Sequence, residues 1–328
     1  MIENITQNIY TFPIKLPHNP LRSLNSYVIK STDGGRDLLI DTGFKRKDCL
    51  SMLLESMDKL GLVPENTDVF LTHFHSDHSG NLGALCAMGC RAIVGRVELG
   101  EFDRSVWPRV PARCSHEGMP DPIVGTFFDN PSMRYMPEDF PIARLVDDGD
   151  VLCYGGRRLQ CIHTPGHSMG HLCLYDGENR ILFCGDHVLF DITPNITCRC
   201  ERRDILQIYL RSLEKVRRLQ PELVLPGHRS YGRLDLSARI DEIIAHHTAR
   251  LNEALQIVHD HPEQTGYEIS GHMAWRIRAK SWDTFPDSQK WFAMGEGLAH
   301  LDYLLEEGRI EQRENAEGKL IYAPRGSL

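Results

Sequence analysis

The densest group of side chains that could do chemistry lies between His73 and His78. Residues 71–80 read Leu-Thr-His-Phe-His-Ser-Asp-His-Ser-Gly, so three histidines and one aspartate occupy six positions. Imidazole and carboxylate groups are common ligands of metals such as zinc. A polar loop with incidental histidines is the alternative, but nothing structural requires imidazoles at this density. Because one tetrahedral ion rarely needs four ligands from six residues, the segment predicts a site for two metal ions.

The residues on either side of this segment predict how it is held. The run 67–71, Thr-Asp-Val-Phe-Leu, is apolar and β-branched, and it predicts a buried strand. The run 82–88 predicts a helix that follows a turn. If the chain stays extended just past the strand, side chains two positions apart share a face. His73, His75 and Asp77 would then converge, and His78 would point to the other side.

Three further candidate ligands follow strand-like runs later in the chain. Each run ends in a glycine-containing turn that presents a histidine or an aspartate, and rigid scaffolds usually display their chemistry at such positions. One Pro-Gly-His or Gly-Asp alone carries little weight, but this order after His-x-His-x-Asp-His is a strong indication. The three residues are His167 after 159–163, Asp186 after 180–184 and His228 after 223–226.

Taken together, these motifs resemble the pattern of the metallo-β-lactamase-fold hydrolases. The segment Asp41-Thr42-Gly43 after the run 37–40 is similar to the usual first acidic motif of that superfamily. The resemblance covers residues 7–232 and is specific for the superfamily rather than for a substrate. It implies two metal ions held by seven side chains: His73, His75 and His167 at one ion, Asp77, His78 and His228 at the other, and Asp186 as the bridge.

The resemblance also suggests roles for individual residues. His75 stands where a carboxylate would have indicated the di-iron, oxygen-reducing branch, so the imidazole favours the hydrolases. Asp77 and Asp186 are the expected catalytic residues: Asp77 would steer the nucleophile and handle its proton, and Asp186 would fix the separation of the ions. Asp41 is expected to support a ligand histidine from outside the coordination shell, with a turn-stabilising role as the alternative.

The remaining histidines in these regions are interpreted differently. His163 lies inside a strand pattern and is expected to be a buried structural or ligand-supporting residue. His171 and His187 flank implied ligands, and they are interpreted as pocket lining or ligand support, with no role as the alternative. His246 and His247 lie on a predicted helix and are interpreted as structural.

The composition is that of an ordinary globular protein. The chain has 328 residues, which predicts one large and one small domain, and 41% of its residues are apolar and 25% charged. The net charge of −8 gives no general attraction to nucleic acids or anionic membranes. The start lacks the basic and apolar regions of a signal peptide, so a cytoplasmic protein is expected and an exported β-lactamase is not.

The ten cysteines do not predict a disulfide scaffold in a chain of this length. Four of them, Cys153, Cys161, Cys173 and Cys184, fall in strand-like apolar runs, where a reduced thiol packs as a small hydrophobic group. Cys198 and Cys200 follow Asp186 closely enough to lie near the mouth of the site. An exposed, redox-sensitive pair is therefore an alternative to simple packing at these two positions.

The pattern of strands and helices predicts a four-layer αββα sandwich of the α/β (α+β) class, and the resemblance implies that the metals lie at one edge between its two sheets. Each half of the sequence is rich in strands and contains helices with one apolar side, which would cover the outer faces of the sheets. The resemblance implies the same fold. The predicted elements are strands within 7–42, 67–72, 91–94, 151–154, 157–163, 171–176, 180–184 and 222–226, and helices at 47–60, 80–88 and 204–219.

Two domains are predicted, a catalytic domain at 1–245 and a C-terminal domain at 246–328. Residues 96–145 carry aromatic residues and prolines without clear periodicity, and they are interpreted as a lid, with a surface insertion or oligomer contact as alternatives. The tail reads as three helices and a hairpin at 309–313 and 319–323, which resembles a winged helix. It has 13 acidic and 9 basic residues, whereas a DNA-reading helix needs Lys and Arg, so packing or dimer formation is expected.

The sequence therefore predicts a hydrolase that uses a hydroxide held at a dinuclear metal centre. The expected substrate is a carbonyl ester, thioester or lactone of a small metabolite. Single-strand RNA phosphodiester hydrolysis is the runner-up, favoured by basic clusters at 199–203, 217–218 and 276–280. A non-catalytic metal-binding protein on the same scaffold is the third interpretation. Zinc is the expected metal, with iron and manganese as alternatives, and a homodimer is considered.

Overall fold

The computed structural model describes residues 1–17, 19–137, 139–276 and 281–326. The chain forms two compact units, each assembled from three stretches of sequence. The first unit contains Met1–Phe102, Pro131–Pro194 and Ser212–Ile240. The second unit contains Asp103–Asn130, Asn195–Arg211 and Asp241–Leu328. Each unit is described by itself below.

The first unit contains a seven-stranded sheet whose strands follow one another in chain order. The pairs from β1 to β4 are antiparallel, and those from β4 to β7 are parallel. Parallel neighbours need a crossover, which α1 (Lys47–Lys59) supplies between β4 and β5, and α3 (Leu82–Ala87) between β5 and β6. The strands are β1 (Glu3–Thr6), β2 (Ile9–Lys15), β3 (Ser23–Ile29), β4 (Asp37–Ile40), β5 (Thr67–Phe70), β6 (Arg91–Gly95) and β7 (Ile142–Val146).

A second sheet of five strands completes the first unit, in the order β12-β11-β10-β9-β8. Its pairs are antiparallel except for β11 and β12, which are parallel and are joined through α7 (Ile205–Arg217). The strands are β8 (Val151–Tyr154), β9 (Arg157–His163), β10 (Leu172–Asp176), β11 (Ile181–Gly185) and β12 (Leu223–Pro226).

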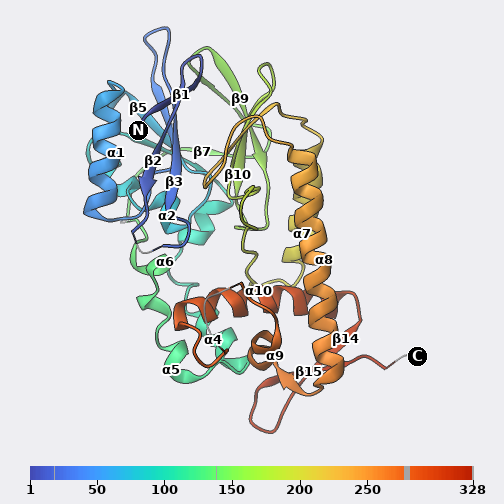
Figure 1. The fold of residues 1–328 in the computed structure, drawn as a ribbon. Helices are drawn as coiled ribbons and strands as arrows, with labels where there is room; N and C mark the ends of the chain where they lie inside the picture. The colour runs from blue at the N-terminus through green and yellow to red at the C-terminus, as the bar shows by residue number, and fades with distance from the viewer. Residues whose placement is uncertain (18, 138, 277–280, 327–328) are drawn as a thin grey trace. The chain divides into compact units, whose positions relative to one another are not determined.

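The two sheets pack face to face, as Figure 1 shows. One apolar core combines side chains of both sheets, such as Phe70 from β5 with Phe183 from β11. A second core lies between the seven-stranded sheet and the helices α1 and α3, with Leu53 and Leu85 among its members. The helix α7 contacts the loop between β9 and β10 of the five-stranded sheet, where Ser212 donates a hydrogen bond to the Pro165 carbonyl at 2.8 Å. The predicted αββα sandwich is confirmed.

The second unit combines helices with a small sheet of strand order β13-β15-β14. The predicted hairpin is present as β14 (Ile310–Glu314) and β15 (Leu320–Pro324), and β13 (Gln264–Thr265) adds a third strand. Whether this part acts as a winged helix stays a prediction. Its helices are α4 (Arg109–His116), α5 (Asp121–Val124), η3 (Phe127–Asp129), α9 (Gly266–His272), α10 (Asp287–Glu306) and the parts of α7 and α8 (Leu236–Asp260) that belong to it.

The segment 96–145 differs from its prediction. The sequence predicts little regular structure there, but the segment contains η2 (Glu98–Phe102), α4, α5, η3, α6 (Pro131–Arg134) and the strand β7. These helices have three to eight residues, too few turns to produce the periodicity by which a helix is recognised in sequence. Its middle stretch, Asp103–Asn130, belongs to the second unit. The lid function and the boundary at residue 245 stay predictions.

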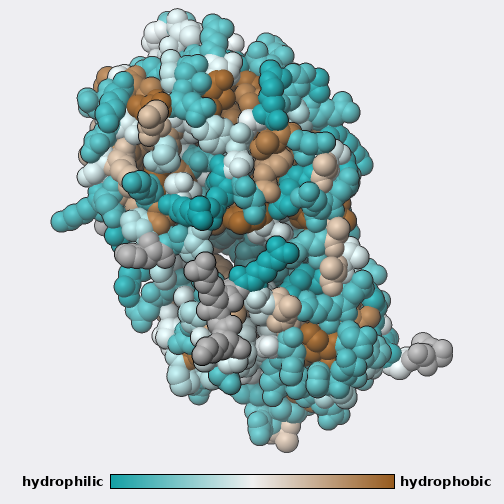
Figure 2. Space-filling model, in the orientation of Figure 1, coloured by the Kyte–Doolittle hydropathy of each residue, from teal (hydrophilic) through white to brown (hydrophobic). Residues whose placement is uncertain are grey.

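The surface is mainly hydrophilic on the face drawn in Figure 2, where hydrophobic residues occur in small groups. The large hydrophobic side chains with substantial exposure include Val97, Leu99, Phe128 and Phe292. Among the described residues, no helix is both long and apolar enough to cross a bilayer.

Candidate metal centre

The segment that carries the first four candidate ligands changes conformation halfway along. The backbone is still extended at His75, and the short helix α2 (Ser76–Ser79) then begins, closed by a hydrogen bond of 2.9 Å from His78 N to the His75 carbonyl. The predicted alternation of side chains therefore ends at His75. Asp77 does not converge with His73 and His75, because the helical turn places it beside a different set of residues.

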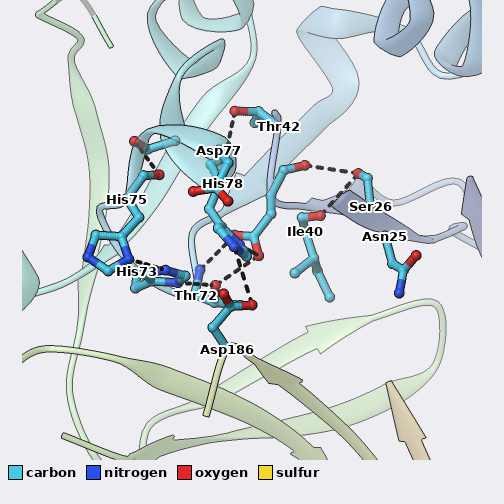
Figure 3. Close-up of polar contacts among 12 residues, drawn as sticks. Asn25, Ser26, Ile40, Thr42, Thr72, His73, His75, Asp77, His78 and Asp186 are labelled. Atoms are coloured by element: carbon cyan, nitrogen blue, oxygen red, sulfur yellow. Dashed lines mark hydrogen bonds and ion pairs between the residues drawn. The ribbon is translucent and has the colours of Figure 1, made fainter. Parts of the chain in front are cut away.

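The first group of candidate ligands consists of three histidines from both sheets. The Nδ1 atom of His75 lies 3.0 Å from Nε2 of His73 and 2.9 Å from Nε2 of His167. His73 and His75 follow β5, and His167 lies in the loop between β9 and β10. Figure 3 shows His73 and His75 with their rings turned toward each other. Three imidazole nitrogens facing one point form a suitable metal site.

The second group combines α2 with the end of β12. Nε2 of His228 lies 3.3 Å from Oδ2 of Asp77 and 3.3 Å from Nε2 of His78. His78 and His228 are fully buried, and Asp77 is nearly so. These three ligand atoms also lie close enough together to hold one ion.

Asp186, which follows β11, lies between the two groups. Its Oδ1 atom is 3.4 Å from Nε2 of His78, and its Oδ2 atom is 3.5 Å from His228 Nε2 and 3.7 Å from His167 Nε2. A Cβ at Gly227 would lie 2.6 Å from Asp186 Oδ1, so the absence of a side chain there lets the carboxylate fit. The Oδ1 atom is buried and accepts no hydrogen bond from the described residues, as expected of an atom oriented for a cation.

The hydrogen bonds behind the ligand histidines fit metal binding. His78 Nδ1 donates to Asp41 Oδ2 at 2.8 Å, and His228 Nδ1 donates to the Ser23 carbonyl at 2.7 Å. The Thr72 hydroxyl donates its only proton to Asp41 at 2.8 Å, so its contact of 3.0 Å with His73 Nδ1 must use the proton of the imidazole. Each Nε2 is then free of its proton and faces the centre, the usual arrangement of metal-bound histidines.

The electrostatics of the centre also suit a cation. Burial, together with the neighbouring histidines, lowers the pKa of His73 well below its usual value, which keeps this imidazole neutral. Burial opposes ionisation of the carboxylates, but the nearby histidines outweigh it, lowering the pKa of Asp77 to about 2 and that of Asp186 further. Burial likewise opposes a charge on His78, but the carboxylates around it raise its pKa, so a metal ion would bind there by displacing the proton that they favour. Ionised carboxylates and neutral imidazole are the forms that bind metals.

The other histidines either support a candidate ligand or lie outside the two groups of ligands. His171 Nδ1 lies 2.8 Å from the Thr164 hydroxyl, and its Nε2 accepts a hydrogen bond of 3.2 Å from the Asp186 amide, so it supports the bridging position. His163 Nε2 contacts the Met169 carbonyl at 2.8 Å and belongs to neither group of candidate ligands. His187 is buried next to Asp186 in the chain, and burial lowers its pKa to about 3. His246 and His247 belong to α8 in the second unit.

Sequence reasoning missed two supports of this centre. Thr72 precedes His73 directly and could have been considered from its position in the motif. The Ser23 carbonyl is a backbone group more than 200 residues away from His228 in the chain, and no side-chain pattern indicates it.

The hypothesis of an exposed pair at Cys198 and Cys200 is wrong in one respect, because Cys198 is buried. Its burial raises the pKa of its thiol to about 12.

Comparison with known proteins identifies the class that this fold and site define. Residues 20–228 match the family model of the metallo-beta-lactamase superfamily, and residues 283–325 match that of the metallo-beta-lactamase-like C-terminal domain. The first match covers more than half of the chain, so the protein belongs to the metallo-beta-lactamase superfamily and has the fold of its hydrolases.

Individual relatives support the same conclusion. A metallo-beta-lactamase family protein from Thermus thermophilus superimposes with a TM-score of 0.80 at 27% identity, covering 97% of this chain and 99% of that one. The beta-lactamase-like protein 2 homolog of Caenorhabditis elegans is 26% identical over 80% of this chain and 77% of its own length. The acyl-coenzyme A thioesterase MBLAC2 of Gallus gallus is 31% identical over 59% of this chain and 68% of its own length.

Proposed function

We propose that the protein is a metal-dependent hydrolase of carbonyl esters of small metabolites, with thioesters as the favoured substrates. The observation that carries this proposal is the position of Asp186, which lies within 3.7 Å of ligand nitrogens from both groups. This arrangement suits two metal ions joined by one carboxylate. The preference for thioesters is supported by the likeness to a thioesterase, MBLAC2 of Gallus gallus.

The seven predicted side chains would hold the ions in two sets. Histidine and aspartate ligands suit zinc best, and iron or manganese are alternatives. When bound, such a pair of ions supplies Lewis acidity and lowers the pKa of a water molecule. The ligands would be His73, His75 and His167 in the first set, Asp77, His78 and His228 in the second, and Asp186 in both.

The protein's own groups would orient and deprotonate the attacking water. Asp77 is ionised at neutral pH because its pKa is held at about 2, so its carboxylate can accept a hydrogen bond from the water and steer its attack on the carbonyl carbon. Asp41 fixes the ring of His78 through Nδ1, and His171 holds the backbone of Asp186 in place. No serine or cysteine nucleophile is required, so we propose direct attack by water: its oxygen bonds to the carbonyl carbon, the carbon–sulfur bond breaks, and the thiol leaves with the proton that the water gives up.

The competing functions receive less support from the described residues. Arg202 pairs with Asp204 at 2.7 Å, and Arg203 lies 3.9 Å from Asp302, so these cations are partly neutralised and are poorly suited to RNA phosphates. The basic cluster at 276–280 lies almost wholly outside the described residues. A non-catalytic role is disfavoured because the scaffold retains all seven ligand side chains.

A substrate panel tests the proposal. Purified protein loaded with Zn²⁺ or Mn²⁺ would be assayed against acyl-coenzyme A thioesters, matched oxygen esters, lactones, bis-nitrophenyl phosphate and labelled single-stranded RNA. We expect a thioester to lead in kcat/KM by about tenfold or more, equivalent to about 1.4 kcal/mol of transition-state stabilisation. Metal analysis should give about two ions per chain. Leading activity on RNA, or less than one ion per chain in every preparation, would contradict the proposal.

A further inference from the structure

A buried carboxylate outside the predicted ligand set joins the two loops of the first histidine group. Glu98, the first residue of η2, is only 1% exposed. Its Oε1 atom accepts hydrogen bonds from the Phe74 amide at 2.6 Å and from the Ser168 hydroxyl at 2.7 Å. Its Oε2 atom accepts a third hydrogen bond, from the Gly170 amide, at 2.7 Å.

Two of these donors are direct neighbours, in the chain, of the histidines of the first group. Phe74 lies between His73 and His75, and Ser168 directly follows His167. The two loops are more than 90 residues apart in the chain and extend from different sheets. Glu98 therefore connects the backbone beside all three histidines of the first group, whose ring nitrogens approach one another at 2.9 and 3.0 Å.

The surroundings of Glu98 are shaped for this close approach. A Cβ at Gly170 would clash with the Glu98 amide nitrogen and lie 2.6 Å from its Oε2 atom, so only glycine fits there without moving the backbone. Ser168 is fully buried, so its hydroxyl lies in the interior together with Glu98. A buried carboxylate that accepts several hydrogen bonds is costly to disturb, because each lost partner leaves a buried polar group.

We propose that Glu98 is a positioning residue of the metal centre, which sets the distance between the loop of His73 and His75 and the loop of His167. This inference rests on the proposed function. Asp41 provides the precedent within the same molecule, since its carboxylate ties Thr72 to His78 beside the second group. Asp41 thus supports His78 directly and His73 through Thr72, and Glu98 controls the affinity and geometry of the first metal site.

The substitution Glu98→Gln separates positioning from space filling. The side chain keeps its size. Its amide NH₂ group, however, is a hydrogen-bond donor, and it would face one of the donors from which Glu98 accepts a hydrogen bond. The matched control is Asp68→Asn. Asp68 is also buried, accepts hydrogen bonds from Arg36 at 2.6 Å and Arg91 at 2.8 Å, and lies on β5, the strand that leads to His73. It therefore reports the cost of losing a buried carboxylate without a link to the histidine loops.

The experiment is a titration of metal-free protein with Co²⁺, followed by visible absorption and by competition with a chelator. Glu98→Gln should weaken one of the two sites by about 10- to 100-fold, the range for residues that hold metal ligands from behind, and should change the absorption bands of the ion bound by the three histidines. Asp68→Asn should lower the unfolding temperature but keep the affinity and the absorption bands of the wild type.

The outcomes separate this inference from the proposed function. Unchanged Co²⁺ affinity and spectrum in Glu98→Gln, or equal losses in Asp68→Asn, would overturn the role of Glu98. If Glu98→Gln does not fold, Ser168→Ala removes one donor and should weaken the site by roughly 3- to 10-fold, and no change there would count against the proposal. A wild type that binds Co²⁺ but hydrolyses no thioester would contradict the proposed substrate only, because the readout for Glu98 is metal binding.

Discussion

Asp186 and His163 both lie at the ends of strands of the five-stranded sheet, but their contacts differ. Asp186 approaches His78, His228 and His167, whereas the ring of His163 contacts the backbone carbonyl of Met169. We expect Asp186→Ala to lower kcat/KM by more than about 100-fold, the upper end for residues one step removed from a metal. His163→Ala should stay within roughly fivefold of the wild type and cost about 1 kcal/mol of stability. Steady-state kinetics with the leading thioester measures both.

Metal content serves as the control for this pair of variants. Asp186→Ala should lose bound metal in proportion to its activity, and His163→Ala should retain it. Equal losses of activity and metal in the two variants would mean that Asp186 does not join the two groups of ligands, and the assignment of the centre would have to be revised.

At the scale of single residues, much of the centre can be predicted. The seven candidate ligands are recognisable in the sequence, because imidazoles and carboxylates after strands are conspicuous and because their order resembles a known family. The spacing argument alone is wrong for Asp77 and for His78, since the helix α2 begins at Ser76 and the His78 ring lies 4.1 Å from the ring of His73. Glu98 is not predicted, because a glutamate in a short 3-10 helix is indistinguishable in sequence from an exposed one until the loops it binds are located.

At the scale of secondary structure, the interior of the second unit contains two carboxyl groups whose pKa values are raised by burial. Burial raises the pKa of Glu117, at the end of α4, to about 7, although Arg113 and the Tyr322 hydroxyl act in the opposite direction. Burial likewise raises the pKa of Asp302, in α10, to about 6, against the effect of Arg113, which binds it at 2.7 Å. These groups join α4, α10 and β15 within the second unit.

The raised pKa of Glu117 predicts a loss of stability with increasing pH. The folded state binds this proton more tightly than the unfolded chain, whose value is near 4.5, so the contribution is full below that pH and is lost as pH rises through about 7. Between pH 5 and pH 8, Glu117→Gln should therefore gain about 2 kcal/mol in unfolding free energy relative to the wild type. Chemical denaturation at both pH values measures this difference.

The exposed Glu311 of β14 provides the control for this measurement. Glu311→Gln should follow the pH dependence of the wild type, because an exposed carboxylate has similar surroundings in the folded and unfolded states. The difference in unfolding free energy between Glu117→Gln and the wild type could instead be the same at both pH values. That result would show that Glu117 is ionised at both, and that burial does not raise its pKa.

Elements with strong periodicity are predicted well, and short ones are not. The helix predicted at 47–60 is α1, and the strands predicted at 151–154 and 157–163 are β8 and β9. The helix is long enough for its apolar side to stand out, and a strand is recognised from a shorter apolar run than a helix needs. The helices α5 and α6, of four residues each, begin near prolines and carry no such pattern, so the sequence predicts no helix at either place.

At the scale of the whole molecule, the second unit is assembled from three separate stretches, which the sequence does not indicate. Its stretches interlock: the rings of Phe127 and Trp291 lie 5.0 Å apart, and the Cys198 amide donates to the Gly295 carbonyl at 2.9 Å. Side chains that meet across such distances in the chain leave no local trace in the sequence. The second unit takes in residues on both sides of position 245, and the domain boundary at that position stays a prediction.

Removal of residues 246–328 tests whether the tail is structural. The truncated chain would keep Asp103–Asn130 and Asn195–Arg211 without the partners they pack against in α10, including Trp291 and Gly295. Because large apolar groups would become exposed, we expect aggregation or strong binding of a hydrophobic dye. Size-exclusion chromatography and dye fluorescence of the truncated and full-length proteins measure this. A monomeric, dye-negative truncated protein would show that the tail is an independent module.

The intact protein should not bind nucleic acid through this tail. Its 13 acidic and 9 basic residues repel phosphates on balance, and the whole chain carries a net charge of −8. We therefore expect no binding of labelled single-stranded RNA or DNA at micromolar protein in low salt, measured by fluorescence anisotropy. Binding that weakens steeply with salt would instead mean that basic residues of the tail, or the arginines around Arg202 outside it, act on phosphates despite their acidic neighbours. In that case the RNA substrate of the panel would become the leading candidate.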